Sequence, residues 1–145
     1  MKILIDADGC PVIKQSIDIS KKYDIEIVII HDTSHSFDKY DVEKIVVPKG
    51  MDSVDFALVN KVQRGDIVIT QDYGLAAMVL SKGGYPINQN GRIYDENNID
   101  ELLFSRHVAK KIRNSGNKLK SIKKRSKDDD IKFKEMLDKL IKDII

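Results

Sequence analysis

The chain has one cysteine, Cys10, among its 145 residues, so it cannot form an internal disulfide. A single cysteine is typical of proteins in a reducing compartment, and a cytoplasmic location is expected. The longest apolar stretch, Ile25–Ile30, is interrupted by Glu26 and is too short to span a bilayer. Only Ile3-Leu4-Ile5 precede the first charged residue after Met1-Lys2, too few for a signal-peptide core. No association with membranes is expected.

The composition and the charge distribution are more informative. Hydrophobic residues make up 41% and charged residues 33% of the chain, which predicts one folded domain over residues 1–145. Residues 1–105 carry 11 basic and 17 acidic side chains, whereas residues 106–145 carry 14 basic and 6 acidic ones. A basic C-terminal segment of this kind is typical of proteins that bind polyanions. The alternative is a lysine-rich helix face exposed to solvent.

Apolar runs of strand length alternate with segments of helical periodicity. The predicted strands are rich in β-branched residues, which suits strands buried on both faces. They are Lys2–Asp6, Ile25–His31, Ile45–Val47 and Ile67–Thr70. The predicted helices between and after them are Val12–Tyr23, Val54–Val62, Leu75–Leu80, Asn98–Asn114 and Ile131–Ile144, with Gly116 as a C-cap. This order predicts an α/β three-layer sandwich with a mostly parallel central sheet and added C-terminal helices. The oligomeric state stays open.

Five aspartates fall where a predicted strand ends or a helix begins. They are Asp6, Asp8, Asp52, Asp55 and Asp72. Since the carboxyl ends of parallel strands lie along one edge of a sheet, these side chains are expected to converge on one pocket. Their mutual repulsion is costly unless a divalent cation neutralises it. Oxygen-only ligands suit hard cations, so the sequence predicts a site for Mg²⁺ or Mn²⁺.

Some of these aspartates have a simpler interpretation as helix caps. Asp72 precedes a predicted helix and is a candidate N-cap, and Asp52 with Asp55 resembles a capping box. Asp6 lies within an apolar strand and has no capping role, and a buried carboxylate without a partner is costly. Asp8 lies outside the expected helix start. The metal-site hypothesis therefore depends on all five residues together.

Three further residues are candidates for other chemistry. Pro11 is expected at the first helical position, which makes Cys10 the N-cap. Cys10 is interpreted as a packed or capping residue, because Ser16 stands where a cysteine phosphatase requires arginine. His31 and His35 lie in a predicted loop, where a spacing of four does not place two side chains together, so they are not expected to bind a metal as a pair.

Several motifs, in a fixed order, resemble those of the bacterial YaiI/YqxD family of uncharacterised proteins. They are Asp6-Ala7-Asp8-Gly9-Cys10-Pro11-Val12, Pro48-x-Gly50-x-Asp52-x-x-Asp55, Gly65-Asp66-x-Val68-Ile69-Thr70-x-Asp72-x-x-Leu75-Ala76, Asn88-x-x-Gly91-x-x-Tyr94 and Asp130-x-x-Phe133-x-x-x-Leu137-Asp138. That family is similar to PIN-like nuclease domains, whose acidic residues bind Mg²⁺ or Mn²⁺ for RNA cleavage. The resemblance implies a PIN-like fold in which the five aspartates are the metal-side residues.

The leading hypothesis is a metal-dependent phosphodiesterase that acts on RNA or DNA. Asp6, Asp8 and Asp72 would be the catalytic metal ligands, Asp52 and Asp55 would complete the cluster, and Thr70 is a further candidate contact. The expected nucleic-acid contacts are basic residues: Lys110, Lys111, Arg113, Lys118, Lys120, Lys123, Lys124 and Arg125. Two alternatives stay open. One is a non-catalytic nucleic-acid-binding protein with a structural cation site, and the other is a small-molecule phosphohydrolase with Asp6 as nucleophile.

Overall fold

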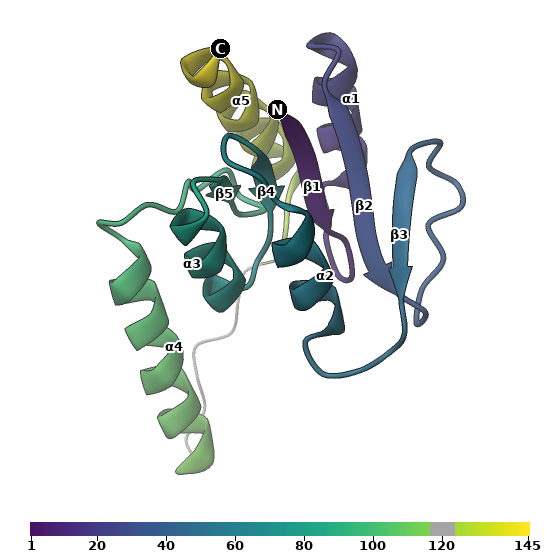
Figure 1. Ribbon diagram of the computed structural model, residues 1–145. Helices are drawn as coiled ribbons and strands as arrows, with labels where there is room; N and C mark the ends of the chain where they lie inside the picture. The colour runs from purple at the N-terminus through teal and green to yellow at the C-terminus, as the bar shows by residue number, and fades with distance from the viewer. Residues whose placement is uncertain (117–123) are drawn as a thin grey trace.

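Five parallel strands form the centre of the computed structural model, which describes residues 1–116 and 124–145 (Figure 1). In chain order they are β1 (Lys2–Asp6), β2 (Glu26–Asp32), β3 (Glu43–Val47), β4 (Ile67–Ile69) and β5 (Tyr85–Ile87). In the sheet they are arranged β3-β2-β1-β4-β5, and every neighbouring pair is parallel. The first strand therefore lies in the middle, and the sheet extends outward from it in both directions. The predicted parallel sheet is confirmed.

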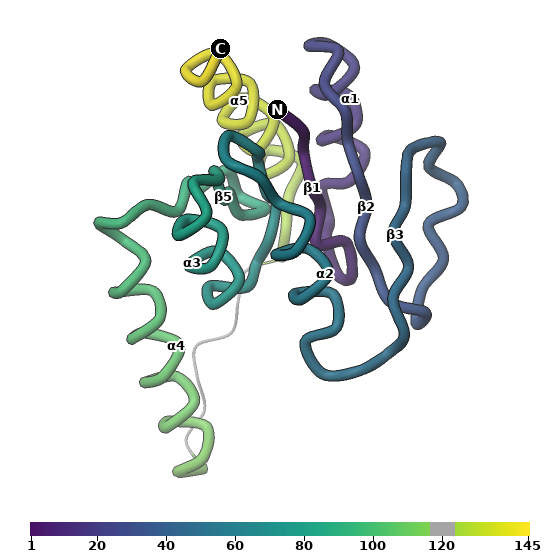
Figure 2. Tube along the Cα trace, in the orientation of Figure 1, coloured from purple at the N-terminus to yellow at the C-terminus, as the bar shows by residue number. Residues whose placement is uncertain are grey.

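Helices cover both faces of this sheet, which makes the molecule the three-layer sandwich that the sequence predicts. The helices are α1 (Ile13–Lys22), α2 (Ser53–Lys61), α3 (Tyr73–Ser81), α4 (Ile99–Asn114) and α5 (Lys127–Ile144). Helices α1 and α5 pack together on one face, and α2 and α3 cover the other (Figures 1 and 2). Helix α4 packs on the outside of α3. Among the helices described, none is long and apolar enough to cross a bilayer.

The alternation of side chains along the central strand explains why both faces are covered. Ile3 and Ile5 of β1 belong to the cluster formed with α1 and α5, whereas Leu4 belongs to the cluster formed with α2 and α3. All three side chains are fully buried. A strand with apolar residues on both faces is stable only between two helical layers, and the continuous apolar runs in the sequence reflect this.

The amino edge of the sheet is fixed by a buried ion pair. Asp66, directly before β4, accepts hydrogen bonds from the backbone N–H groups of Lys2 at 3.0 Å and of Gln63 at 2.8 Å. The Lys2 ammonium also lies 2.6 Å from Asp66 Oδ2, and the aspartate side chain is 4% exposed. This clamp fixes the start of β1 against the start of β4, so their carboxyl ends are held side by side.

The helix starts lie one to four residues from the predicted ones, and local hydrogen bonds explain the differences at α1 and α5. Helix α1 begins at Ile13 with Val12 as its N-cap, so Pro11 is not the first helical residue. A turn closed by the Cys10 N–H on the Ala7 carbonyl, with Gly9 at φ +77°, occupies the preceding residues and delays the helix. Helix α5 begins at Lys127 rather than at Ile131, because a capping box forms directly before it, between the side chains and backbone of Ser126 and Asp129.

The end of α4 agrees with the prediction. Gly116 has φ +83° and follows the C-cap residue Ser115. Its N–H donates to the Arg113 carbonyl, so glycine occupies the left-handed position that commonly ends a helix. Gly116 therefore ends the helix as predicted, but it follows the C-cap residue Ser115 rather than being the C-cap itself.

Candidate metal centre at the carboxyl edge of the sheet

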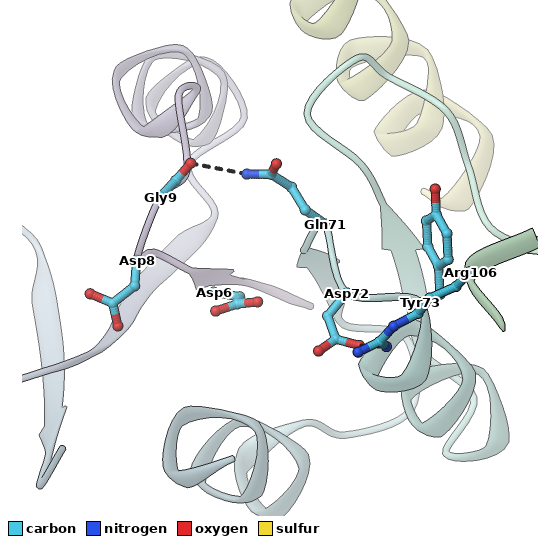
Figure 3. Close-up of a pocket in the computed structure, with 7 residues that line it drawn as sticks. All are labelled: Asp6, Asp8, Gly9, Gln71, Asp72, Tyr73 and Arg106. Carbon is cyan, nitrogen blue, oxygen red and sulfur yellow. Dashed lines mark hydrogen bonds and ion pairs between the residues drawn. The ribbon is translucent and has the colours of Figure 1, made fainter. Parts of the chain in front are cut away.

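All five predicted aspartates line two adjoining cavities at the carboxyl edge of the sheet. A cavity of about 410 Å³ is lined by Asp6, Asp8 and Asp72 (Figure 3). A second cavity, of about 280 Å³, is lined by Asp52, Asp55 and again Asp72. We refer to the first as the acidic pocket and to the second as the side cavity. Because β1 lies between β2 and β4, segments far apart in the sequence meet at this edge.

A threonine connects the two central aspartates. The Thr70 hydroxyl donates to Asp6 Oδ2 at 2.8 Å and accepts from the Asp72 N–H at 3.0 Å. Thr70 is 1% exposed, so this link is shielded from water. The expected contact of Thr70 with the site is confirmed. In Figure 3, Asp6 lies between Asp8 and Asp72, at the centre of the group.

Burial, together with repulsion between neighbouring carboxylates, disfavours the charged forms of Asp6 and Asp55. Burial raises the pKa of Asp6 to about 6; the Thr70 hydrogen bond opposes this rise, and the charges of Asp72 and Asp8 add to it. Burial also raises the pKa of Asp55 to about 6, with further contributions from Asp72, Asp6 and Asp52. Carboxylates from three separate segments therefore share one electrostatic environment. A divalent cation at this position would relieve their repulsion.

The capping interpretation holds for one aspartate and fails for another. Asp72 is the N-cap of α3, and its Oδ1 accepts from the N–H groups of Gly74 at 2.8 Å and Leu75 at 3.2 Å. Asp52 occupies the N-cap position of α2 but makes no capping hydrogen bond with its side chain. Its φ of +59° is left-handed, whereas a capping residue normally has extended backbone geometry. The capping box predicted for Asp52 and Asp55 is wrong.

A second acidic group, which sequence reasoning missed, adjoins Asp8. Asp8 Oδ2 accepts from the Asp32 N–H at 2.9 Å, and Asp8 Oδ1 lies 3.2 Å from His35 Nδ1. Potential ligand atoms of Asp8, Asp32 and His35 all lie within 4.8 Å of one another. The sequence could have indicated Asp32 as a site residue, because Asp32 ends β2 as Asp6 ends β1. His35 gives no such signal, since only the folding of the loop after β2 brings it back to Asp8.

His31 takes no part in that group, and it lies within β2 rather than in the predicted loop. Its side chain is in the buried part of β2, with 4% exposure, and its Nδ1 lies 2.6 Å from the neighbouring Asp32 carbonyl oxygen. Its ring packs against Phe37. The interpretation that His31 and His35 do not form a metal-binding pair is consistent with this arrangement.

A cation from α4 also reaches the acidic pocket. Arg106 Nη1 lies 3.5 Å from Asp72 Oδ1, and the arginine side chain is 60% exposed (Figure 3). Arg106 lines both the acidic pocket and the side cavity. The sequence places it at the start of the basic segment, but nothing there assigns it to the site. An exposed guanidinium beside a carboxylate cluster is suited to bind the oxygens of a phosphate.

The basic residues predicted to contact nucleic acid fall into three groups. Lys110, Lys111 and Arg113 are exposed on the C-terminal half of α4, and Lys124 is exposed just before α5. Lys118, Lys120 and Lys123 lie outside the described residues.

Arg125, the last of these basic residues, has a structural role. Its guanidinium donates to Asp130 at 2.7 Å, to the Asn90 side chain at 2.8 Å and to the Gln89 carbonyl at 2.7 Å. These three bonds tie the start of α5 to the loop after β5. Contact of Arg125 with nucleic acid stays a prediction. A nucleic-acid phosphate would have to compete with these internal partners for the guanidinium.

The environment of Cys10 does not favour a nucleophilic thiolate. Cys10 packs against the core cluster on the α1 face. Burial raises the pKa of its thiol to about 11, so the thiol is protonated at neutral pH. Its interpretation as a packed residue is confirmed, and it does not cap α1, whose N-cap is Val12.

Comparisons with known proteins agree on one family. The family model described as "Uncharacterized BCR, YaiI/YqxD family" matches residues 4–143. A UPF0178 protein of Ruminiclostridium cellulolyticum is 52% identical over 137 residues, which cover 94% of this chain and 90% of the relative. A UPF0178 protein of Exiguobacterium sibiricum is 46% identical over 141 residues, covering 97% and 96% of the two chains. No solved structure is significantly similar to the chain.

Proposed function

The chain belongs to the YaiI/YqxD family, whose name specifies no reaction, and we propose that it is a divalent-metal-dependent phosphodiesterase that cleaves nucleic acid, with RNA as the preferred substrate. The observation that carries the proposal is the meeting of Asp6, Asp55 and Asp72 around adjoining cavities at one edge of the sheet. Such a cluster is unfavourable for the fold alone, since burial disfavours the charged carboxylates and they also repel one another. A bound cation that neutralises them would offset this cost.

The type of donor atom in the acidic pocket suits Mg²⁺ or Mn²⁺, whereas the three potential ligand atoms that lie within 4.8 Å of one another in the described residues belong to Asp8, Asp32 and His35. Asp6, Asp8 and Asp72 offer carboxylate oxygens alone, the ligands that these hard cations prefer. Asp55 and Asp52 line the side cavity together with Asp72 and would complete the set directly or through bound water. Bound divalent cations activate water and stabilise the leaving oxygen in phosphodiester cleavage, so no histidine base is required.

The remaining residues of the site would orient the ligands and hold the substrate. The Thr70 hydroxyl donates to the Asp6 carboxylate and accepts from the Asp72 backbone, which presets the spacing of the two ligands. Arg106 would contact a phosphate at the boundary of the two cavities. Lys110 and Lys111 on the exposed face of α4 would add backbone contacts that do not depend on base sequence.

The test is a cleavage assay on labelled single-stranded RNA and DNA, with Mn²⁺, with Mg²⁺ or with a chelator. Wild type should cleave with metal and not with chelator. Asp6→Asn and Asp72→Asn should abolish turnover, and asparagine at position 72 keeps the helix cap. Asp143→Asn is the matched control, because Asp143 is exposed near the C-terminal end of α5. Cleavage that survives in Asp72→Asn, or in chelator, would overturn the proposal.

A binding assay and a phosphomonoester hydrolysis assay on the same variants separate the two other functions considered from sequence. Salt-dependent RNA binding without cleavage, unaffected by Asp6→Asn, would indicate a non-catalytic nucleic-acid-binding protein. Hydrolysis of a small phosphomonoester, with a phosphate trapped on Asp6, would indicate a phosphohydrolase with an aspartate nucleophile. Neither outcome is expected.

A further inference from the structure

The side cavity combines an aromatic side chain with the acidic cluster. It lies between α2 and α3, and Arg106 of α4 forms part of its wall. The apolar part of the lining comes from Phe56 of α2 with Met78 and Leu75 of α3. Phe56 is 63% exposed and Met78 is 38% exposed, although both are large apolar side chains. The cavity therefore presents an open aromatic ring directly beside carboxylates.

Packing of the fold does not require Phe56. Helix α2 is anchored by Leu58, which is fully buried in the cluster with Leu4 and Val28. Phe56 is two residues before Leu58 and does not belong to that cluster. A single exposed apolar residue is common on protein surfaces and needs no explanation by itself. Phe56 differs from such residues because it lines a concave cavity that shares Asp72 and Arg106 with the acidic pocket.

We propose that the side cavity is a base-binding subsite, in which one unpaired nucleobase stacks on Phe56 while the adjacent phosphate lies at the acidic pocket. The proposal rests on the proposed function and names the form of substrate that the same site takes. Base–aromatic stacking is largely independent of sequence, because every base has a π-face. The cavity of about 280 Å³ is just below the usual range of about 300–1,000 Å³ for small-molecule sites, so its size favours a single base over a larger group.

Charge complementarity determines which part of a nucleotide lies where. Apart from Arg106 at its boundary with the acidic pocket, the charged side chains that line the side cavity are carboxylates, so the cavity disfavours a second phosphate and accepts a neutral base. Arg106 lines both cavities and is placed to receive the phosphate that links them. Gln71 lines the acidic pocket and also a further cavity of about 480 Å³, together with Gln89 and Lys124. That further cavity offers amide and ammonium donors, which suit a sugar–phosphate backbone.

This arrangement predicts selectivity for single strands. In a duplex each base is stacked and paired, so it cannot enter a cavity beside the phosphate without being unpaired first. A single strand presents its bases freely and avoids this cost. The protein should therefore bind and cleave unpaired strands and leave paired segments of the same sequence intact.

The direct test uses tryptophan fluorescence, because the chain contains no tryptophan. Phe56→Trp places one fluorophore in the side cavity. Tyr85→Trp is the matched control, because Tyr85 is a half-exposed aromatic residue at the amino end of β5, away from the site. Both variants are held in Ca²⁺, a cation that takes oxygen ligands. Each is titrated with single-stranded oligoadenylate, with its duplex and with an abasic strand of equal length.

The single strand should quench the fluorescence of the Phe56→Trp variant by stacking, whereas the duplex and the abasic strand should not. The Tyr85→Trp variant should respond to none of the three.

Affinity provides the second readout. Phe56→Ala should weaken binding of the labelled single strand about tenfold, and Phe56→Tyr should retain it, since a tyrosine ring also stacks. Phe56 is exposed, so these substitutions leave the core intact. Equal quenching by the abasic strand, or unchanged affinity in Phe56→Ala, would overturn the proposal. So would the absence of any binding of the single strand.

Failure of the subsite and failure of the nuclease function give different results. Cleavage by wild type, together with unchanged fluorescence of the Phe56→Trp variant, would refute the subsite and leave the nuclease proposal in place. Quenching of that variant by the single strand, with no cleavage by wild type in any metal, would retain the base subsite and refute the nuclease. The two proposals are therefore tested independently.

Discussion

Replacing Asp6 by asparagine should stabilise the fold while it removes a metal ligand. The pKa of Asp6 is raised from 3.8 to about 6, chiefly by burial. The stabilising contribution of the protonated Asp6 carboxyl is fully present below pH 3.8. It is lost as the pH rises through about 6, because folding then requires burial of a charged carboxylate. At about 1.36 kcal/mol per pKa unit, the cost above pH 6 is about 3 kcal/mol. The pKa of about 6 already includes the opposing hydrogen bond from Thr70, so no separate term for this bond is subtracted. The gain in stability expected for Asp6→Asn near pH 7 is therefore about 3 kcal/mol.

Urea denaturation of the metal-free protein, followed by circular dichroism, measures this gain near pH 7 and again near pH 4. Asp6→Asn should exceed wild type at pH 7, and the difference should shrink at pH 4, where Asp6 of the folded wild type is already protonated. Asp143→Asn controls for the general effect of removing one negative charge. A loss of stability at pH 7, or an equal gain at both pH values, would show that burial of the Asp6 charge does not cost stability.

Two ion-paired residues and the pH dependence of metal binding give three further tests. Asp66→Ala should lower the free energy of unfolding, measured by urea denaturation, by about 3–5 kcal/mol, because it leaves the Lys2 ammonium without its buried partner. A loss below about 1 kcal/mol would show that this ion pair does not hold the starts of β1 and β4 together. Arg125→Gln should lower the free energy of unfolding by about 1–2 kcal/mol, since charge-assisted hydrogen bonds that hold the start of α5 are lost. An unchanged unfolding midpoint would show that these bonds do not stabilise the fold. Mn²⁺ affinity in calorimetry should fall from pH 7 to pH 5, because protons compete for Asp6 and Asp55, whose pKa values are about 6; a flat pH profile would separate these groups from the metal.

The fold could be predicted from the sequence because its signals are continuous along the chain. The strands are apolar runs buried on both faces, as Ile3, Leu4 and Ile5 show, and such runs have few other stable environments. Helix starts were less predictable, because they depend on local hydrogen bonds. The turn at Ala7–Cys10 delays α1, and the capping box at Ser126 advances α5. Neither of these changes alters the apolar periodicity.

The candidate site was predictable where a residue directly follows a strand. Asp6 ends β1 and Asp72 follows β4. These strands are neighbours in the sheet, so strand order alone brings the two aspartates together. Asp32 follows the same rule at the end of β2 and was missed. Arg106 and His35 could not be predicted, because each reaches the site from an element whose path depends on tertiary packing. Sequence separation carries no information about such contacts.

Calorimetric titration with Mn²⁺ would establish whether carboxylates distant in sequence share one cation. We expect binding to wild type and to Asp143→Asn, and loss of binding in both Asp6→Asn and Asp72→Asn. Position 72 keeps its helix cap as asparagine, so loss there reports on the metal rather than on the fold. Absence of binding in wild type, or equally tight binding in the two variants, would exclude a shared cation site at this edge of the sheet.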